Sequence, residues 1–119
     1  MRTTTDMWTY REGVATAGVS HRNVVGYGVE ATDGSIGKVD DATYDVGSSY
    51  LVVDTGPWIF GKKVMLPAGV IENVDHDDEK IMVDRSKDEI KNAPEFDDSM
   101  VRDEGYRTRL GSYYDEAGR

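Results

Sequence analysis

The chain has 119 residues with 23 acidic and 14 basic side chains, a formal net charge of −9 at pH 7 and no cysteine. A chain of this length can form one domain with a modest core and short flanking segments. The negative charge has the wrong sign for neutralising phosphates, so we expect no nucleic-acid partner. The lack of cysteine excludes thiolate metal sites, thiol nucleophiles and disulfides. No apolar run forms a signal-peptide core or approaches the ~18 residues of a membrane helix, which predicts a cytoplasmic protein without membrane insertion.

Residues 1–23 have the composition of an N-terminal arm, because they are polar and rich in threonine and glycine apart from Met7, Trp8 and Tyr10. Trp8 and Tyr10 are two positions apart, which places both side chains on one face of an extended segment. We expect this segment to dock on the chain's own domain.

The next segment has the alternation of a β-hairpin. Apolar or small side chains recur at every second position from residue 25 to 31, and the turn at 32–35 contains Gly34, which can adopt positive φ. The return strand covers residues 36–45. Its alternation slips at residues 39–41, as an extra bulge residue would cause.

Two further strands are predicted in the middle of the chain. Residues 50–54 are the most strongly apolar run and predict a central strand, with Leu51 and Val53 pointing inward. After a Gly-Pro break, a short strand covers residues 64–66, and Pro67 stops it.

Residues 70–75 and 80–85 predict a second hairpin, across an acidic loop at 76–79. Six short strands at close spacing favour a barrel or a sandwich over a βαβ arrangement.

A helix is predicted only after these strands, where Ser86 and Glu89 have the spacing of a capping box. Ile90 and Ala93 give this short helix an apolar face, and Pro94 ends it. We expect the helix to plug one end of a barrel.

Residues 97–119 are acidic and predict a mostly disordered C-terminal tail. A few large side chains are scattered through it, namely Tyr106, Leu110, Tyr113 and Tyr114.

Several stretches follow one another in a set order along the middle of the chain. They are Gly26-Tyr27-Gly28-Val29-Glu30-Ala31, Asp33-Gly34-Ser35-Ile36-Gly37-Lys38-Val39-Asp40-Asp41, Gly61-Lys62-Lys63-Val64-Met65-Leu66-Pro67, Val70 to Val74, and Asp84 to Lys91 followed by Pro94. Their order resembles the PRC-barrel family, which is named after the cytoplasmic part of the photosynthetic reaction-centre H subunit. The arm and the tail look like those of stand-alone actinobacterial members. The resemblance implies an all-β fold: a small six-stranded PRC-type β-barrel at residues 24–96, with one short C-terminal helix and flexible polar tails.

The resemblance implies little about activity. A reaction-centre H subunit carries a membrane helix before its barrel, and the ribosome maturation factor of the same family carries another β domain. Residues 1–23 supply neither. We therefore expect neither photosynthetic electron transfer nor ribosome work from this chain.

Two groups of acidic side chains are candidates for binding chemistry. Residues 75–79 lack the alternating oxygen spacing of a calcium loop, and a solvated hairpin tip explains them equally well. Asp40, Asp41 and Asp45 could supply a general acid and base, but neighbours on a strand point to opposite faces. His21 has no serine or acid at a recognisable spacing for nucleophilic catalysis. We therefore predict no enzyme, no metal site and no cofactor.

The segment Trp58-Ile59-Phe60 is the main candidate for a partner or dimer contact. Strand alternation cannot bury all three side chains on one face. Either Trp58 and Phe60 point into the core, or part of the segment is exposed as an interface anchor, where aromatic residues are enriched. A homodimer that covers this segment or a strand edge is expected.

The sequence thus predicts a non-catalytic protein-interaction or assembly module that forms a homodimer and whose protein partner the sequence does not specify. Two alternatives stay open. One is metal-ion or small-molecule binding at the acidic loops. The other is a peripheral accessory role at a photosynthetic or electron-transfer complex, by analogy with the reaction-centre H subunit.

Overall fold

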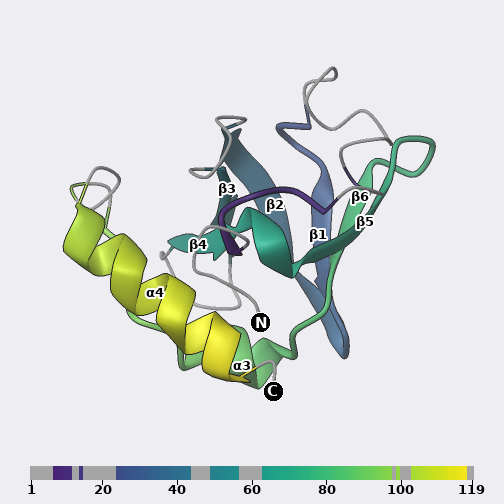
Figure 1. The fold of residues 1–119 in the computed structure, drawn as a ribbon. Coiled ribbons are helices and arrows are strands. Elements are labelled where there is room, and N and C mark those ends of the chain that lie inside the picture. Colours follow the sequence, from purple (N-terminus) through teal and green to yellow (C-terminus); the bar gives the residue numbers. More distant parts are fainter. Residues whose placement is uncertain are drawn as a thin grey trace.

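The fold is that of a computed structural model, which describes residues 7–11, 14, 24–43, 49–56, 63–97, 99 and 103–117. In this part of the chain six strands form one open mixed sheet with the order β4-β3-β2-β1-β6-β5 (Figure 1). The strands are β1 (Gly28–Ala31), β2 (Gly34–Ala42), β3 (Tyr50–Asp54), β4 (Lys63–Pro67), β5 (Ile71–Asp75) and β6 (Lys80–Val83). The helical segments are η1 (Ala68–Val70), α3 (Lys87–Lys91) and α4 (Glu104–Ala117).

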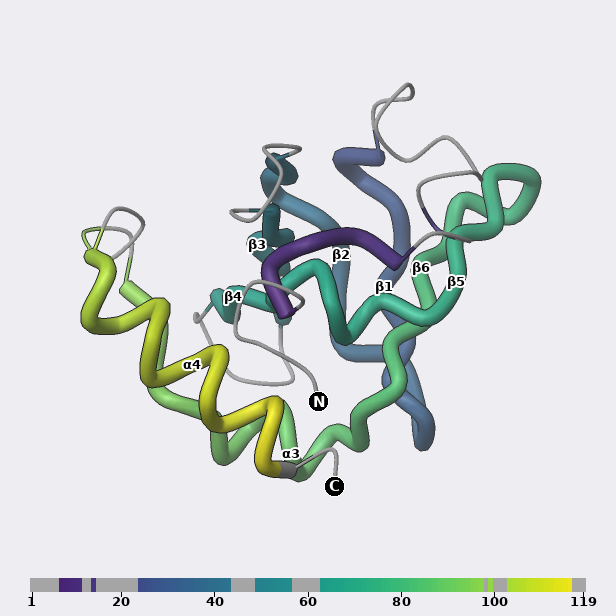
Figure 2. The backbone as a smooth tube through the Cα atoms, in the orientation of Figure 1, coloured from purple at the N-terminus to yellow at the C-terminus, as the bar shows by residue number. Residues whose placement is uncertain are grey.

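The sheet is open because β4 and β5 are its two edges. Among the described residues no strand pairing joins these edges, so the predicted closure into a barrel is not confirmed. The short turn η1 connects β4 directly to β5, and Figure 2 traces this path between the two edges. Neighbouring strands are antiparallel except β1 and β6, which run parallel.

The predicted hairpin of β1 and β2 is confirmed, and so is the bulge in β2. The register of β2 against β3 shifts between Val39 and Asp41. Gly37 allows this part of β2 to approach β3 closely, since a Cβ atom at this position would lie 2.1 Å from the carbonyl oxygen of Asp54. A residue other than glycine would therefore push the two strands apart.

Strand β3 is buried on both faces, and Leu51 and Val53, predicted to point inward, are both fully buried. Tyr50 and Val52 on the other face are also buried. The N-terminal arm covers part of this face, because the ring of Trp8 meets Tyr50 edge to face at a centroid distance of 6.5 Å. The expected docking of Trp8 on the chain's own domain is confirmed.

Polar contacts hold the arm in place as well. The backbone amide of Ser49 donates to the carbonyl oxygen of Trp8 at 2.8 Å, and the Tyr10 hydroxyl donates to the carbonyl oxygen of Thr43 at 2.7 Å. Arg11 pairs with Asp84 and donates to a backbone carbonyl of η1. The arm is therefore part of the fold at residues 7–11.

The second hairpin and the capped helix follow the prediction. Strands β5 and β6 pair across the acidic loop. In α3 the Ser86 hydroxyl accepts from the Glu89 amide at 3.2 Å, and the Glu89 carboxylate accepts from the Ser86 amide at 3.0 Å. The capping box thus forms as its spacing predicts.

Residues 104–117 differ from the prediction of a disordered tail, because they form α4. Tyr106, Leu110 and Tyr114 recur at intervals of four, which places them on one face of a helix, and all three are buried. Asp103 precedes the helix, and its carboxylate accepts from the Tyr106 amide at 3.1 Å. Buried residues of the arm and of α4 belong to the same hydrophobic cluster as the sheet. The core therefore extends beyond residues 24–96.

Candidate binding pocket

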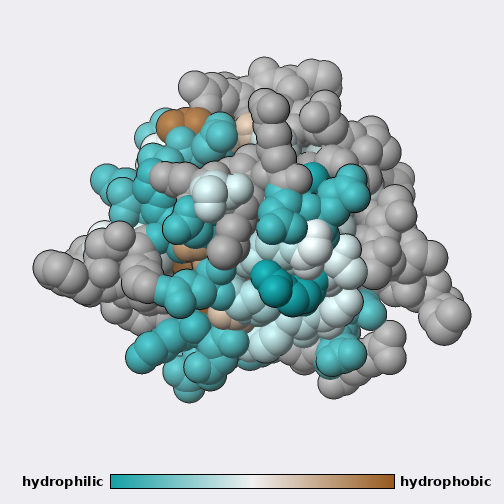
Figure 3. All heavy atoms as spheres, turned by 90° about the vertical axis from the view of Figure 1, so that its left-hand side faces the viewer, coloured by the Kyte–Doolittle hydropathy of each residue, from teal (hydrophilic) through white to brown (hydrophobic). Residues whose placement is uncertain are grey.

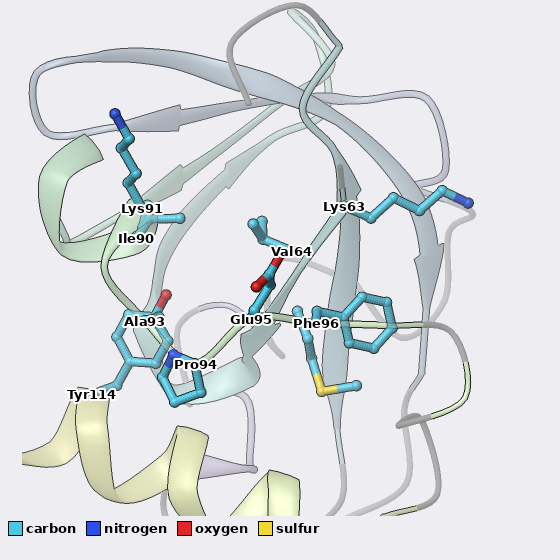
Figure 4. A pocket seen from close by; sticks show the side chains of 10 residues that line it. Lys63, Val64, Ile90, Lys91, Ala93, Pro94, Glu95, Phe96 and Tyr114 are labelled. Carbon is cyan, nitrogen blue, oxygen red and sulfur yellow. The ribbon is translucent and has the colours of Figure 1, made fainter. Parts of the chain in front are cut away.

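A cavity of about 270 Å³ lies between the edge strand β4, helix α3 and helix α4 (Figure 4). Most of its lining is apolar. The residues that line it are Lys63, Val64, Met65, Ile90, Lys91, Ala93, Pro94, Glu95, Phe96 and Tyr114. The volume is slightly below the roughly 300–1,000 Å³ of typical small-molecule pockets. The cavity can hold about one aromatic ring with a substituent.

Elements far apart in the sequence form the walls of this cavity. Strand β4 supplies one wall, and the capped helix α3 with the irregular segment after it supplies a second. Helix α4 is fixed against that segment by hydrogen bonds. The Tyr113 hydroxyl donates to the carbonyl oxygen of Glu89 at 2.6 Å, and the Arg85 guanidinium donates to the carbonyl oxygen of Tyr114 at 3.0 Å. The Tyr106 hydroxyl donates to the Pro94 carbonyl at 3.3 Å.

The Tyr114 hydroxyl is an unusual group in the packing beside this cavity. The Tyr114 side chain is 0% exposed, and its hydroxyl has no hydrogen-bond partner in the described part of the chain. Figure 4 shows the ring rising from α4, with the oxygen at the end near Ala93. A buried polar group left without a partner costs about 1–3 kcal/mol. A phenylalanine at this position would have no hydroxyl and would avoid this cost in stability.

The electrostatics keep this hydroxyl neutral. Burial raises the pKa of Tyr114 well above the ordinary value of tyrosine, and the neighbouring Tyr113 and Tyr106 raise it further, whereas Arg85 opposes the change. A phenol of this kind retains its proton at neutral pH. It can donate or accept a hydrogen bond but is a poor proton-transfer group.

Charged side chains stand at the rim of the cavity. Figure 4 shows the ammonium groups of Lys63 and Lys91 directed away from its centre, whereas the Glu95 carboxylate lies beside Val64. The Lys63 ammonium pairs with Asp40 at 3.0 Å. The lining is therefore mostly apolar apart from the Glu95 carboxylate beside Val64, and neither ammonium group points to the centre of the cavity.

The surface on this side of the molecule is mainly hydrophilic. Figure 3 shows small hydrophobic areas between hydrophilic side chains, and no broad hydrophobic patch among the coloured residues. On this face, an apolar group of a partner could therefore be buried only in a small hollow.

The segment predicted as the partner contact, Trp58-Ile59-Phe60, lies outside the described residues. The choice between core and interface for these three side chains therefore stays open. Three positions further along the chain, Lys63 begins β4 and lines the cavity.

Among the described residues, the acidic candidates do not converge on a common site. Asp40 and Asp41 are exposed, and the Asp41 carboxylate accepts from the amide of the next residue at 2.9 Å. Asp45 and His21 lie outside the described residues. Within the part of the chain that the structure describes, no three potential metal ligands come together.

The loop at residues 75–79 has local hydrogen bonds instead. The Asp75 carboxylate accepts from the Asp78 amide at 3.0 Å, which closes the turn. The His76 ring shares a 2.9 Å hydrogen bond with the Tyr27 hydroxyl. These contacts are those of a structured hairpin tip.

The pocket itself was not predicted from the sequence. Its only local signal is the spacing of Tyr106, Leu110 and Tyr114, which indicates a helix face. No single segment of the sequence indicates that this helix face lies next to β4.

The chain matches no model of a known protein family, and a search of curated proteins finds no relative. The PRC-barrel resemblance therefore rests on the sequence stretches alone and stays a prediction. Among the described residues, no helix combines the length and the hydropathy needed to cross a membrane.

Proposed function

We propose that this protein is a non-catalytic protein-interaction module that binds an extended segment of a partner beside the edge strand β4. The observation that carries the proposal is the position of the cavity: Lys63, Val64 and Met65 of this edge strand line it. An edge strand can pair with an added strand, and a pocket next to it can take one side chain of that strand. Backbone pairing would supply affinity and the pocket specificity.

The chemistry of the cavity favours recognition over catalysis. Its walls are largely apolar, and the phenol of Tyr114, whose ring borders it, keeps its proton. General acid–base catalysis needs a group whose pKa lies near the working pH. The raised pKa of Tyr114 moves this phenol further from that condition.

The net charge of −9 supports a basic partner, because opposite charge accelerates encounter and disfavours acidic competitors. The PRC-type barrel belongs to this proposal too. The two edge strands, β4 and β5, are joined directly by the three residues of η1, and this short connection supports a strongly curved sheet. Homodimerisation, through a strand edge or through Trp58-Ile59-Phe60, remains a prediction.

A site-specific photocrosslinking experiment in the cells that produce the protein tests the proposal. A benzophenone amino acid replaces Lys91 at the rim of the cavity or, as a matched control, Glu72. Both residues are exposed, but Glu72 lies on the opposite edge strand, β5. We expect one discrete adduct from position 91 and none of the same mass from position 72. An adduct of twice the chain mass would identify the homodimer.

The same experiment with the cavity filled by Ala93→Phe separates specific from accidental adducts. The adduct at position 91 should disappear in this variant, whose folding is checked by circular dichroism. Equal adducts at positions 91 and 72, or an adduct that survives in the folded Ala93→Phe protein, would contradict the proposal.

A further inference from the structure

We infer that the cavity between β4, α3 and α4 binds an arginine side chain of the partner segment, whose guanidinium pairs with the Glu95 carboxylate. This inference rests on the proposed function, because it names the side chain that the bound segment inserts beside β4. The observation behind it is that Glu95 is exposed to solvent and also lines a mostly apolar cavity. Figure 4 shows its carboxylate beside Val64, whereas the ammonium groups of Lys63 and Lys91 are directed away from the centre.

The charges around the cavity favour a cationic occupant over an anionic one. Among the described residues that line the cavity, Glu95 carries the only carboxylate. The Lys63 ammonium is paired with Asp40 at 3.0 Å, which offsets its charge. The chain as a whole carries a net charge of −9, so its long-range field attracts cations and repels anions. An acidic side chain in the cavity would be repelled both by Glu95 and by this field.

A wholly apolar occupant is disfavoured for a different reason. A segment that inserts an apolar side chain here would cover the exposed Glu95 carboxylate and remove part of its water, which is costly unless a charged partner replaces that water. A guanidinium supplies two parallel N–H donors to one carboxylate. Glu95 also interacts within the chain, but its two oxygens can accept several hydrogen bonds.

The walls of the cavity suit the long arginine side chain. Its methylene groups can lie against Val64, Met65 and Ile90 while the charged end stays in contact with water beside Glu95. Phe96 adds an aromatic ring, and guanidinium groups stack on such rings. A guanidinium is planar and less strongly hydrated than an ammonium group, which favours arginine over lysine in a partly buried ion pair. Arginine is also among the residues that most often anchor protein interfaces.

A comparison of N-acetylargininamide with N-acetylcitrullinamide tests the inference, because citrulline has the shape of arginine without its charge. Binding to the full chain is followed through backbone amide shifts in ¹H–¹⁵N spectra. We expect the arginine probe to give saturable shifts centred on Val64, Ala93 and Phe96. The citrulline probe should bind about fivefold more weakly, and added sodium chloride should reduce this difference. Equal affinity of the two probes, or no saturable shifts from the arginine probe, would overturn the inference.

Two variants that each remove one negative charge locate the pairing. Glu95→Gln should lower the affinity for the arginine probe about fivefold, to that of the citrulline probe. Asp97→Asn removes a charge from a nearby exposed side chain outside the cavity lining and should leave the affinity unchanged. Circular dichroism checks that both variants fold. An unchanged affinity in Glu95→Gln, or the same loss in both variants, would contradict the pairing with Glu95.

A lysine probe separates arginine from cations in general. N-acetyllysinamide carries the charge without the planar fork and should bind more weakly than the arginine probe, and equal affinity would overturn the choice of arginine. The crosslink from position 91 keeps this inference apart from the proposed function. Failure of the arginine probe, together with an adduct at position 91 that Ala93→Phe abolishes, would refute this inference alone and leave the interaction module standing.

Discussion

Helix α4 meets the rest of the molecule in two regions that are packed very differently. Near its middle, Gly111 lies so close to the arm that a Cβ atom there would be 2.8 Å from Nε1 of Trp8. The guanidinium of Arg107 lies 5.0 Å from the centre of the Trp8 ring and 5.7 Å from that of Tyr50. One turn further, at Tyr114, the same helix borders a cavity of about 270 Å³.

This contrast shows that the cavity does not result from a generally loose fit of the helix. Protein interiors are close-packed, and the contact of Gly111 with Trp8 meets that standard. The space beside Tyr114 is local. Local departures from good packing and hydrogen bonding are typical of binding sites.

The largest expected effect concerns the tightly packed region. Trp8→Ala removes a buried indole that contacts both Tyr50 and α4. We expect the free energy of unfolding to fall by about 3 kcal/mol, as for other buried tryptophans, in a urea titration. A change below about 1 kcal/mol would mean that the arm does not hold α4 on the sheet.

The two adjacent tyrosines of α4 give a smaller and sharper test. Tyr113→Phe deletes a hydroxyl bonded to the Glu89 carbonyl at 2.6 Å and should lower the free energy of unfolding by about 1 kcal/mol. Tyr114→Phe deletes the unpaired hydroxyl and should leave the stability unchanged or raise it by up to about 1 kcal/mol.

Thermal unfolding of the two variants under the same conditions makes this comparison directly. A difference of about 1 kcal/mol corresponds to roughly 4 °C in a domain of this size. Equal losses in both variants would show that the Tyr114 hydroxyl is bonded in solution.

The last effect is a change of stability that appears only at high pH. The pKa of Tyr114 is raised by burial in the folded chain above the value of 10.0 expected when unfolded. Below pH about 10 both states keep the proton, so the contribution of this group is constant. Above it only the unfolded chain releases the proton, and the free energy of unfolding falls by about 1.4 kcal/mol per pH unit for this group.

Urea titrations from about pH 8 to about pH 11 span the ordinary pKa of tyrosine and check this dependence. The fall above pH about 10 should be shallower in Tyr114→Phe, which lacks the group. An identical pH profile in both proteins would show that Tyr114 ionises normally in the fold.

The sequence predicted the hairpins and the capped helix because their signals are local. The alternation in β1 and the slip at Val39 and Asp41 depend only on nearby residues, and so does the capping box of Ser86 and Glu89. Each of these features appears in the structure where the sequence places it. Local chemistry decides them before any tertiary contact forms.

Helix α4 and the open sheet depend on contacts that no local pattern contains. The acidic composition of residues 97–119 favours disorder. The four-residue spacing of Tyr106, Leu110 and Tyr114 stabilises a helix only when that helix face is buried against the segment at 85–96. Closure of a barrel would require β4 to pair with β5, and alternation within each strand does not specify its neighbours. The cavity is likewise formed by β4 and α4 together.

The most direct test of the recognition site beside β4 is the crosslink from position 91. We expect one discrete adduct there, none of the same mass from position 72 on β5, and loss of the adduct in the folded Ala93→Phe protein. Equal adducts at positions 91 and 72, or an adduct that survives in the folded Ala93→Phe protein, would contradict the claim that this cavity is a recognition site.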